Sequence, residues 1–411
     1  MSQQYLDIKS LLELEYYKKH DRIKWHLDSN IYEEIGDDIR KWLKQLSFSE
    51  EEKEIFDLIY PIYYESISTY MSILYDKYLL NKKNIKPIFS KDSKNFLIPV
   101  FDEVFIKDYN LSFDLIKKRT KFSLFKIIYA FIINFLPKSF FKGVVICNND
   151  LANQYIKNDY RYLKISMINH FPINLKTSNF TENLSSKITQ HITSKFSFKY
   201  NSLNKKNINS INEITNKYLS RAYNDLKYYK GFLKGTKCIL TSTGAGYLSR
   251  LASNIAKKHK SVVKRFSHGG DRCFYLDKEH WENEFFQTDI YYTYSKYWVK
   301  YFENINIEIK SDIKVSQSSH LKNIYNKHFN RKSESNDKVL YLPNCFIGER
   351  RTLYHQRLID ILLYDFQKYI LEILKKNKIK VIYKKHPKGI QINETILNSL
   401  VDEVSTQPMI E

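Results

Sequence analysis

The stretch from residue 236 to residue 267 constrains the fold most strongly. It opens with the β-rich segment TKCILTS, turns at TGAG, continues as YLSRLASNIAKKHK and closes with a second β-rich run, SVVKRFS. In the third segment Leu248, Leu251 and Ile255 recur at helical spacing, and lysines follow in its last turn. A strand–helix–strand unit implies a right-handed crossover and a parallel sheet. The pattern therefore predicts a layered α/β domain.

The same alternation continues and then restarts. DIYYTYS reads as a strand, KYWVKYFENI as a helix and IKVSQSSH as another strand, before a polar segment at 326–337. Beyond that segment KVLYLPN and KIKVIYKKHPKG read as strands on either side of a long amphipathic helix. We therefore predict an N-terminal α/β lobe over 86–325, a linker over 326–337 and a second α/β lobe from 338 to 411.

The region before residue 86 is predicted to be helical. Ser49 is a suitable N-cap because acidic residues fill the turn that follows it. Pro61 is expected to kink this helix or to make it restart. At the other end of the chain, 24 residues follow Pro387, whereas one strand–helix–strand unit takes about 30 residues. The second lobe is accordingly expected to be incomplete, in a chain that is a fragment.

Charge points to an anionic partner. The 411 residues include 66 Lys and Arg against 45 acidic residues, a formal charge of +21. Such an excess favours phosphorylated small molecules, nucleic acid, acidic glycans or an anionic membrane face. A general Lys-rich composition that covers the whole surface explains the same excess equally well. The four cysteines contain no C-x-x-C pair, which argues against a zinc site and a disulfide framework.

One apolar segment bears on location. Residues 122–143 contain the mainly apolar stretch Ile127–Leu136 with lysines on both sides, and this stretch is too short to span a bilayer. The segment suits either a membrane interface or, as the favoured alternative, a buried helix with solvated lysines. The polar start of the chain does not resemble a signal peptide. The predicted location is cytoplasmic, with peripheral contact to the inner face of the membrane as an option.

The predicted site lies in three loops at strand ends, because ligands of open α/β sheets bind outside the carboxyl ends of the strands. The first loop contains Thr243, Gly244 and Gly246 before a helix, where free N–H groups can meet an anion. The alternative is that these glycines only shape a tight turn. The second loop contains His268, which can accept a proton, followed by Gly269, Gly270 and Asp271. Asp271 or Glu282 is expected to orient His268 or to replace it as the base.

The third loop is basic. Lys384, Lys385 and His386 surround the end of a predicted strand, where two ammonium groups and an imidazole suit a phosphate leaving group. Arg350, after the preceding strand, is a further candidate for phosphate contact. A basic surface turn is the simpler interpretation of both segments.

The ordered set of strand, T-x-x-G, helix, strand, His-Gly-Gly, linker, strand and Lys-x-His-Pro resembles bacterial surface-carbohydrate glycosyltransferases. These capsule and lipopolysaccharide enzymes have two Rossmann-like lobes, the GT-B architecture. The set is also similar to the Kdo-transferase and sialyltransferase groups, and it covers residues 236–390. The resemblance places Thr243, Gly244, Gly246 and His268 on the acceptor side, and Lys384 and His386 at the nucleotide of the donor. Ser267 departs from many relatives, which have Gln at that position.

The resemblance implies transfer of a sugar from a nucleotide-sugar donor, with a CMP-linked sugar as first candidate, to a glycan or lipid-linked acceptor. His268 or Asp271 is the expected base, and Lys384, Lys385 and His386 are expected to stabilise the departing phosphate. No cofactor is expected, and no metal, because no D-x-D-like carboxylate pair accompanies these loops. Two alternatives stay open. One is a basic nucleic-acid-binding protein, although no motif supports it. The other is a non-catalytic scaffold with a transferase-like fold.

Overall fold

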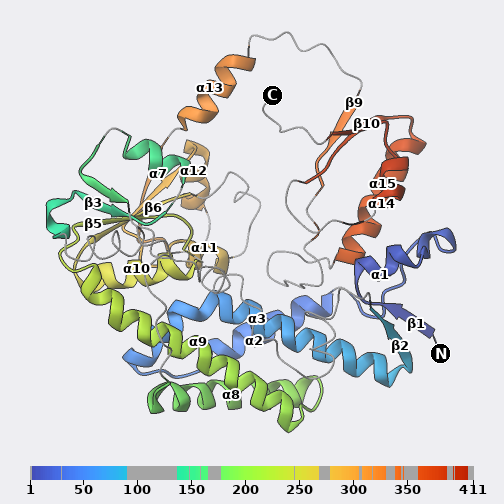
Figure 1. The fold of residues 1–411 in the computed structure, drawn as a ribbon, viewed down its shortest axis with the longest axis horizontal. Helices are drawn as coiled ribbons and strands as arrows, with labels where there is room; N and C mark the ends of the chain where they lie inside the picture. Colours follow the sequence, from blue (N-terminus) through green and yellow to red (C-terminus); the bar gives the residue numbers. More distant parts are fainter. Residues whose placement is uncertain are drawn as a thin grey trace, which may run out of the picture.

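The chain is an α/β protein whose sheets are parallel. A computed structural model describes residues 2–28, 30–89, 137–147, 149–157, 159–164, 177–244, 246–267, 278–304, 308–316, 318–329, 338–343, 346, 360–386, 392 and 394–405. Within these residues the strands form one six-stranded, one three-stranded and one two-stranded sheet. Long helices make up most of the remainder (Figure 1).

The largest sheet confirms the strand–helix–strand prediction. Its strands are β3 (Gly143–Val145), β4 (Tyr162–Lys164), β5 (Cys238–Thr241), β6 (Val262–Phe266), β7 (Ile290–Thr293) and β8 (Asp312–Val315). Their order is β4-β3-β5-β6-β7-β8, and every neighbouring pair is parallel. The connecting helices are α7 (Asp150–Tyr155), α10 (Tyr247–Lys258), α11 (Lys278–Glu284) and α12 (Lys296–Asn304). All carboxyl ends of the strands consequently share one edge.

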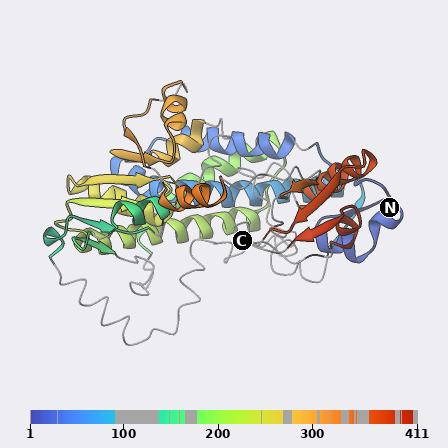
Figure 2. The same cartoon turned by 90° about the horizontal axis from the view of Figure 1, so that it is seen from above.

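A layer of four long helices covers one side of this sheet. They are α2 (Asn30–Lys44), α3 (Glu50–Lys82), α8 (Asn179–Lys199) and α9 (Lys205–Phe232), and they extend across the molecule in Figures 1 and 2. Leu184, Ile188, Ile192 and Phe196 recur every four residues on α8 and are fully buried in the main core. That core also contains α10 and strand residues Val144, Ile239 and Val263. Among the described residues no helix is long and apolar enough to cross a membrane.

Helix α3 begins as predicted but does not restart at Pro61. Ser49 and Glu52 form a reciprocal capping box at its first turn. The helix then runs without a break to Lys82 with Pro61 inside it. Proline has no N–H to donate to the carbonyl four residues earlier, which here is that of Asp57. The guanidinium of Arg250 on α10 donates to this carbonyl at 2.6 Å and so replaces the missing donor.

The C-terminal part forms a smaller parallel sheet. Strands β9 (Lys338–Tyr341), β10 (Lys380–Lys384) and β11 (Glu403–Ser405) lie in the order β11-β10-β9. Helices α14 (Asp360–Lys376) and α15 (Thr395–Ser399) connect them. Before this sheet, α13 (Ser319–His328) continues into the predicted linker, so that residues 326–328 are helical. Phe329 is the C-cap of this helix, and linker residues 330–337 lie outside the described residues.

The predicted helical region 1–85 does not form a unit of its own. Its first residues include β1 (Ser2–Tyr5), which pairs in parallel with β2 (Ile85–Ile88), and α1 (Ile8–Glu13). Ile8 and Leu11 of α1 are buried in one cluster with Leu371 of α14 and Leu397 of α15. Helices α2 and α3, by contrast, belong to the core of the six-stranded sheet. The start of the chain thus completes the small C-terminal core.

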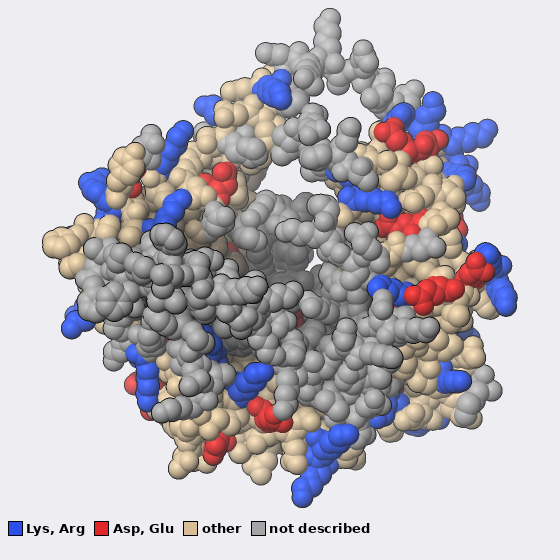
Figure 3. Space-filling view, in the orientation of Figure 1, with Lys and Arg blue, Asp and Glu red and all other residues tan. Residues whose placement is uncertain are grey.

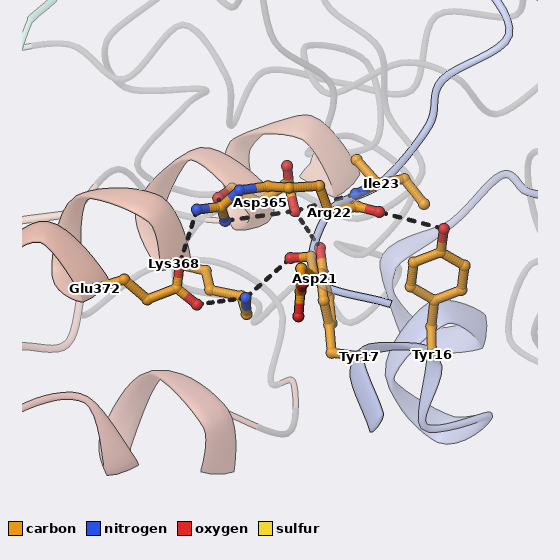
Figure 4. A network of polar contacts seen from close by, with 8 residues as sticks. All are labelled: Tyr16, Tyr17, Asp21, Arg22, Ile23, Asp365, Lys368 and Glu372. Carbon is orange, nitrogen blue, oxygen red and sulfur yellow. Dashed lines mark hydrogen bonds and ion pairs between the residues drawn. The ribbon is translucent and has the colours of Figure 1, made fainter. Parts of the chain in front are cut away.

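Polar contacts fasten the same N-terminal segment to α14. Tyr17 Oη donates to Asp365 Oδ1 at 3.0 Å, and Arg22 Nη2 donates to Glu372 Oε2 at 2.7 Å (Figure 4). Lys368 Nζ donates to the Asp21 carbonyl at 2.9 Å and also to Glu372. Burial and the Asp365 carboxylate raise the pKa of Tyr17, so its hydroxyl stays protonated and donates. We call this set the N-terminal clamp.

Candidate functional site

The carboxyl ends of both larger sheets point toward the middle of the molecule. In Figure 1 the strands of the six-stranded sheet run from the left margin inward, and β9 and β10 run inward from the opposite side. The turn after β5 contains Thr243, Gly244 and Gly246, and β10 ends at Lys384. His268, Gly269, Gly270, Asp271 and Arg350 lie outside the described residues.

A buried carboxylate holds the turn after β5. Glu284, the last residue of α11, is 1% exposed. Its Oε2 atom accepts from Thr243 Oγ1 at 3.0 Å and from the Gly244 N–H at 3.1 Å. Thr243 and Gly244, which the sequence suggested as contacts for an external ligand, therefore already bind the Glu284 carboxylate. The turn resembles an anion site that is filled by the protein's own side chain.

Only glycine fits at position 244, because the surrounding groups leave no room for a side chain. A Cβ atom at this position would lie 2.0 Å from Arg265 Nη1 and 2.0 Å from the Asn283 carbonyl oxygen. At Gly246, the N-cap of α10, the nearest atom to such a Cβ would be 3.5 Å away. The two glycines thus differ in function: Gly244 permits close packing, whereas Gly246 has ordinary space around it.

Two buried arginines connect the turn to its surroundings. Arg250 donates to the Gly244 carbonyl at 2.9 Å and to Asn283 Oδ1 at 2.6 Å. Arg265 on β6 donates to the Glu284 carbonyl at 3.1 Å and to Ser253 Oγ at 2.9 Å. Burial lowers the pKa of Arg250 to about 9, and the nearby Arg265 charge acts in the same direction. Both guanidinium groups remain charged at neutral pH, and the Glu284 carboxylate offsets part of that charge.

The residue before the His-Gly-Gly motif is fixed in place. Ser267 is buried at the carboxyl end of β6, and its N–H donates to the Tyr292 carbonyl at 2.8 Å. The Ser267 carbonyl accepts from Asn149 Nδ2, also at 2.8 Å. Both backbone groups at this position are occupied, so the chain leaves β6 toward His268 from a rigid point.

The basic end of β10 is only partly available to a ligand. Lys385 Nζ forms an ion pair of 2.7 Å with Glu394 Oε2, which offsets the charge of this lysine. The Lys385 N–H donates to the Ser405 carbonyl of β11 at 3.2 Å. Lys384 is half-buried, and the side chain of His386 is exposed. Lys384 and His386 are the other two candidates for contact with a phosphate at this strand end.

Glu282 does not lie at this edge. It is exposed on α11, and its Oε2 atom lies 3.6 Å from Lys44 Nζ. With Lys257, Trp281, Asp289 and Lys310 it lines a pocket of about 380 Å³ near the amino ends of β7 and β8. Lys257 pairs with Asp289, and Lys310 pairs with Glu308 at 3.5 Å. Because these charges are matched in pairs, the pocket selects no ligand class, and it faces away from the predicted site.

Sequence reasoning missed Glu284, Arg250, Arg265 and Asn283. These residues come from α10, β6 and α11, and only the fold brings them together. One signal was present, because Arg265 interrupts the apolar run of a predicted buried strand. An arginine in such a position requires a buried partner.

The described residues contain no group of three or more His, Cys, Asp or Glu side chains suited to a metal ion. Cys147 and Cys238 are free thiols, and burial raises the pKa of Cys147 to about 12 and that of Cys238 to about 11. These two thiols therefore stay protonated and are poor nucleophiles at neutral pH. The chemistry available at the described strand ends is hydrogen bonding, to which the Lys384 ammonium group adds positive charge.

Comparison with known proteins gives no relative from which a function can be transferred. No protein-family model, no curated protein and no solved structure matches this chain. The side chains at the strand ends are consequently the basis for assigning a function.

Proposed function

We propose that this protein is a glycosyltransferase with two Rossmann-like lobes of the GT-B type. It would transfer a sugar from a nucleotide-sugar donor, with CMP-linked sugars as the first candidates, to a glycan or lipid-linked acceptor in bacterial surface-carbohydrate assembly. The proposal rests on one observation above all. Two separate parallel sheets direct their carboxyl ends toward the same central region (Figure 1). Ligands of open α/β sheets bind at such ends.

The small sheet would bind the donor. Lys384 and His386 stand at the carboxyl end of β10, where their hydrogen-bond donors suit the phosphate of a nucleotide. Lys385 is paired with Glu394, so its role would be to fix this loop. Positive charge close to the leaving phosphate stabilises the transition state more than the ground state.

The large sheet would bind the acceptor. In this proposal His268 or Asp271 takes the proton from the attacking hydroxyl. The residues before them support such a role, because Ser267 is held by hydrogen bonds on both sides. Thr243 and Gly244 are positioning residues rather than ligands, since Glu284 occupies their donors. Catalysis depends on this kind of rigid support.

The proposal is tested by a thermal-shift screen of the full chain against CMP-, UDP- and GDP-sugars. A ligand that binds the folded state raises the melting temperature, by an amount that grows with its concentration over Kd. We expect a shift with one nucleotide class, and loss of that shift in His386→Ala with the unliganded melting temperature unchanged. His259→Ala is the matched control. His259 is the C-cap of α10, at the opposite end of that helix from the turn after β5.

Two outcomes would contradict the proposal. The absence of a shift with all three nucleotide classes would favour the non-catalytic scaffold. An equal shift in wild type and in His386→Ala would remove β10 from the donor site.

A further inference from the structure

The amino ends of β3, β4 and β5, on the side of the six-stranded sheet opposite the candidate site, are strongly basic. Gly143 pairs with Tyr162, and Val144 pairs with Ile239, so Lys142 is flanked by Arg161 and Lys237. Backbone contacts agree with this register, because the Lys142 N–H donates to the Arg161 carbonyl at 2.8 Å. Neighbouring strands are about 4.8 Å apart, which makes these three residues a continuous row.

Further exposed cations extend the row. We define the basic edge as the exposed residues Phe140, Lys142, Lys157, Tyr160, Arg161, Lys234, Lys237 and Lys260. Lys260 follows α10, and the Val262 N–H after it donates to the Lys237 carbonyl at 3.0 Å. Asp159 lies beside this edge and is bound to Arg161 Nε at 2.8 Å and to Lys142 Nζ at 3.4 Å. Within the basic edge the six cations outnumber the Asp159 carboxylate, and Asp289, at the neighbouring amino end of β7, is paired with Lys257.

Two aromatic side chains project from the same edge. Phe140 is 80% exposed and Tyr160 is 94% exposed. Phe140 ends the short 3-10 helix η3 (Lys138–Phe140), and Tyr160 lies in the turn between α7 and β4. Aromatic rings beside basic residues suit the level of lipid headgroups, where their apolar faces enter the interface.

We propose that the basic edge docks this protein on the surface of an anionic lipid bilayer. The cations would face the headgroups, and Phe140 and Tyr160 would enter the interface. Figure 3 shows Lys and Arg side chains on the left-hand side of the molecule, where this edge lies. This inference does not depend on the transferase proposal.

The test is co-sedimentation of the full chain with vesicles of phosphatidylcholine, alone or mixed with phosphatidylglycerol. We expect binding to the mixed vesicles that weakens as salt is added. The triple variant Lys142→Gln, Lys237→Gln, Lys260→Gln should bind on the order of a hundredfold more weakly. The variant Phe140→Ser, Tyr160→Ser should bind about tenfold more weakly, because less apolar surface enters the interface.

Matched controls remove the same charge and the same rings elsewhere. Lys322→Gln, Lys327→Gln, Lys376→Gln changes three exposed lysines on α13 and α14. Phe198→Ser, Tyr297→Ser changes two rings that are 94% and 75% exposed. Both controls should bind mixed vesicles within about threefold of wild type, since their residues are outside the basic edge.

Three results would overturn the proposal. The first is no binding of wild type to the mixed vesicles. The second is an equal loss in the control lysine variant, which would show that net charge alone causes binding. The third is binding to a single-stranded oligonucleotide, lost in the Lys142, Lys237, Lys260 variant, without vesicle binding. Because the assay contains no nucleotide sugar, its failure is distinguishable from failure of the transferase proposal.

Discussion

Gly244 and Glu284 decide the conformation of the turn after β5. The carboxylate binds the turn from α11, and the missing Cβ lets Arg265 and Asn283 approach it. Each side chain here serves several partners, so none can be changed in isolation. The turn and α11 should consequently behave as one unit in stability and in ligand binding.

The two glycines of this turn should respond differently to substitution. Gly244→Ala places a methyl group 2.0 Å from Arg265 Nη1, and we expect it to lower the free energy of unfolding by about 3 kcal/mol or more. Gly246→Ala meets nothing closer than 3.5 Å and should cost less than about 1 kcal/mol. Urea denaturation measures both. Equal losses would mean that packing at Gly244 is not the cause.

Glu284→Gln keeps the shape of the side chain and removes its charge. The Thr243 and Gly244 donors then face a weaker acceptor, and Arg265 loses a compensating charge. We expect a loss of about 2–3 kcal/mol, seen as a lower urea midpoint with an unchanged slope. Glu308→Gln, at a side chain that is 82% exposed, is the control and should be neutral. A neutral Glu284→Gln would show that the carboxylate contributes no net stability.

The sequence predicts some residues of this site but not the buried residues that hold them in place. Thr243, Gly244 and Lys384 are recognisable because glycines and basic residues follow apolar strands. Glu284 is not recognisable, because it lies 40 residues after Gly244 and nothing in its local pattern indicates burial. Its role depends on where α11 packs, and local spacing carries no information about that.

At the level of elements, α10 is connected to α3 where Arg250 donates to the Asp57 carbonyl, which Pro61 leaves without its helical donor. The guanidinium supplies the donor that proline removes from the helix. The arginine is therefore part of the hydrogen bonding of a helix to which it does not belong. This contact explains why α3 continues through Pro61 instead of restarting.

A double-mutant cycle measures this connection. Pro61→Ala restores an N–H that can donate to the Asp57 carbonyl, so Arg250→Lys should cost less in that background than in wild type. We expect a coupling energy of about 1 kcal/mol from urea denaturation of the four proteins. The same cycle with Ala152→Gly, a change on α7, serves as control and should show additivity. If the effects of Pro61→Ala and Arg250→Lys were additive as well, Arg250 would not be replacing the donor that Pro61 lacks at the Asp57 carbonyl.

Elements were predictable wherever the hydrophobic period was clear. The alternation from β5 to α12 has strongly patterned segments, and the structure confirms it. Helix α8 was missed, although its apolar residues recur every four positions, because Ser, Thr and Asn obscured that spacing. Strand β1 has four residues and exists because β2, about 80 residues later, pairs with it. Such a strand is set by tertiary pairing rather than by propensity.

At the scale of the whole molecule, the N-terminal clamp joins the two ends of the chain. Arg22 and Lys368 both bind Glu372, and Tyr17 binds Asp365 (Figure 4). Burial raises the pKa of Glu372, but the hydrogen bonds and charges of Lys368 and Arg22 outweigh it and lower the pKa below 4.5. A depressed carboxyl pKa stabilises the fold above the unfolded value and loses this effect as pH falls.

The clamp should therefore weaken in acid. At pH 6 we expect Glu372→Gln to be less stable than wild type by up to about 1 kcal/mol, a modest value because the side chain is partly exposed. The difference should shrink as pH falls below 4.5, when wild type also loses the carboxylate. Urea midpoints at several pH values test this. A difference that stays constant down to pH 3 would contradict it, and Glu303→Gln, at an exposed carboxylate on α12, should show no such trend.

Burial of α1 against α14 and α15 also has a consequence for synthesis on the ribosome. Ile8 and Leu11 are translated hundreds of residues before Leu371 and Leu397, which pack in the same buried cluster. Until then these apolar side chains have no native partner and are open to chaperones and to self-association. Helix α1 is thus expected to reach its native position only after α14 and α15 have been synthesised.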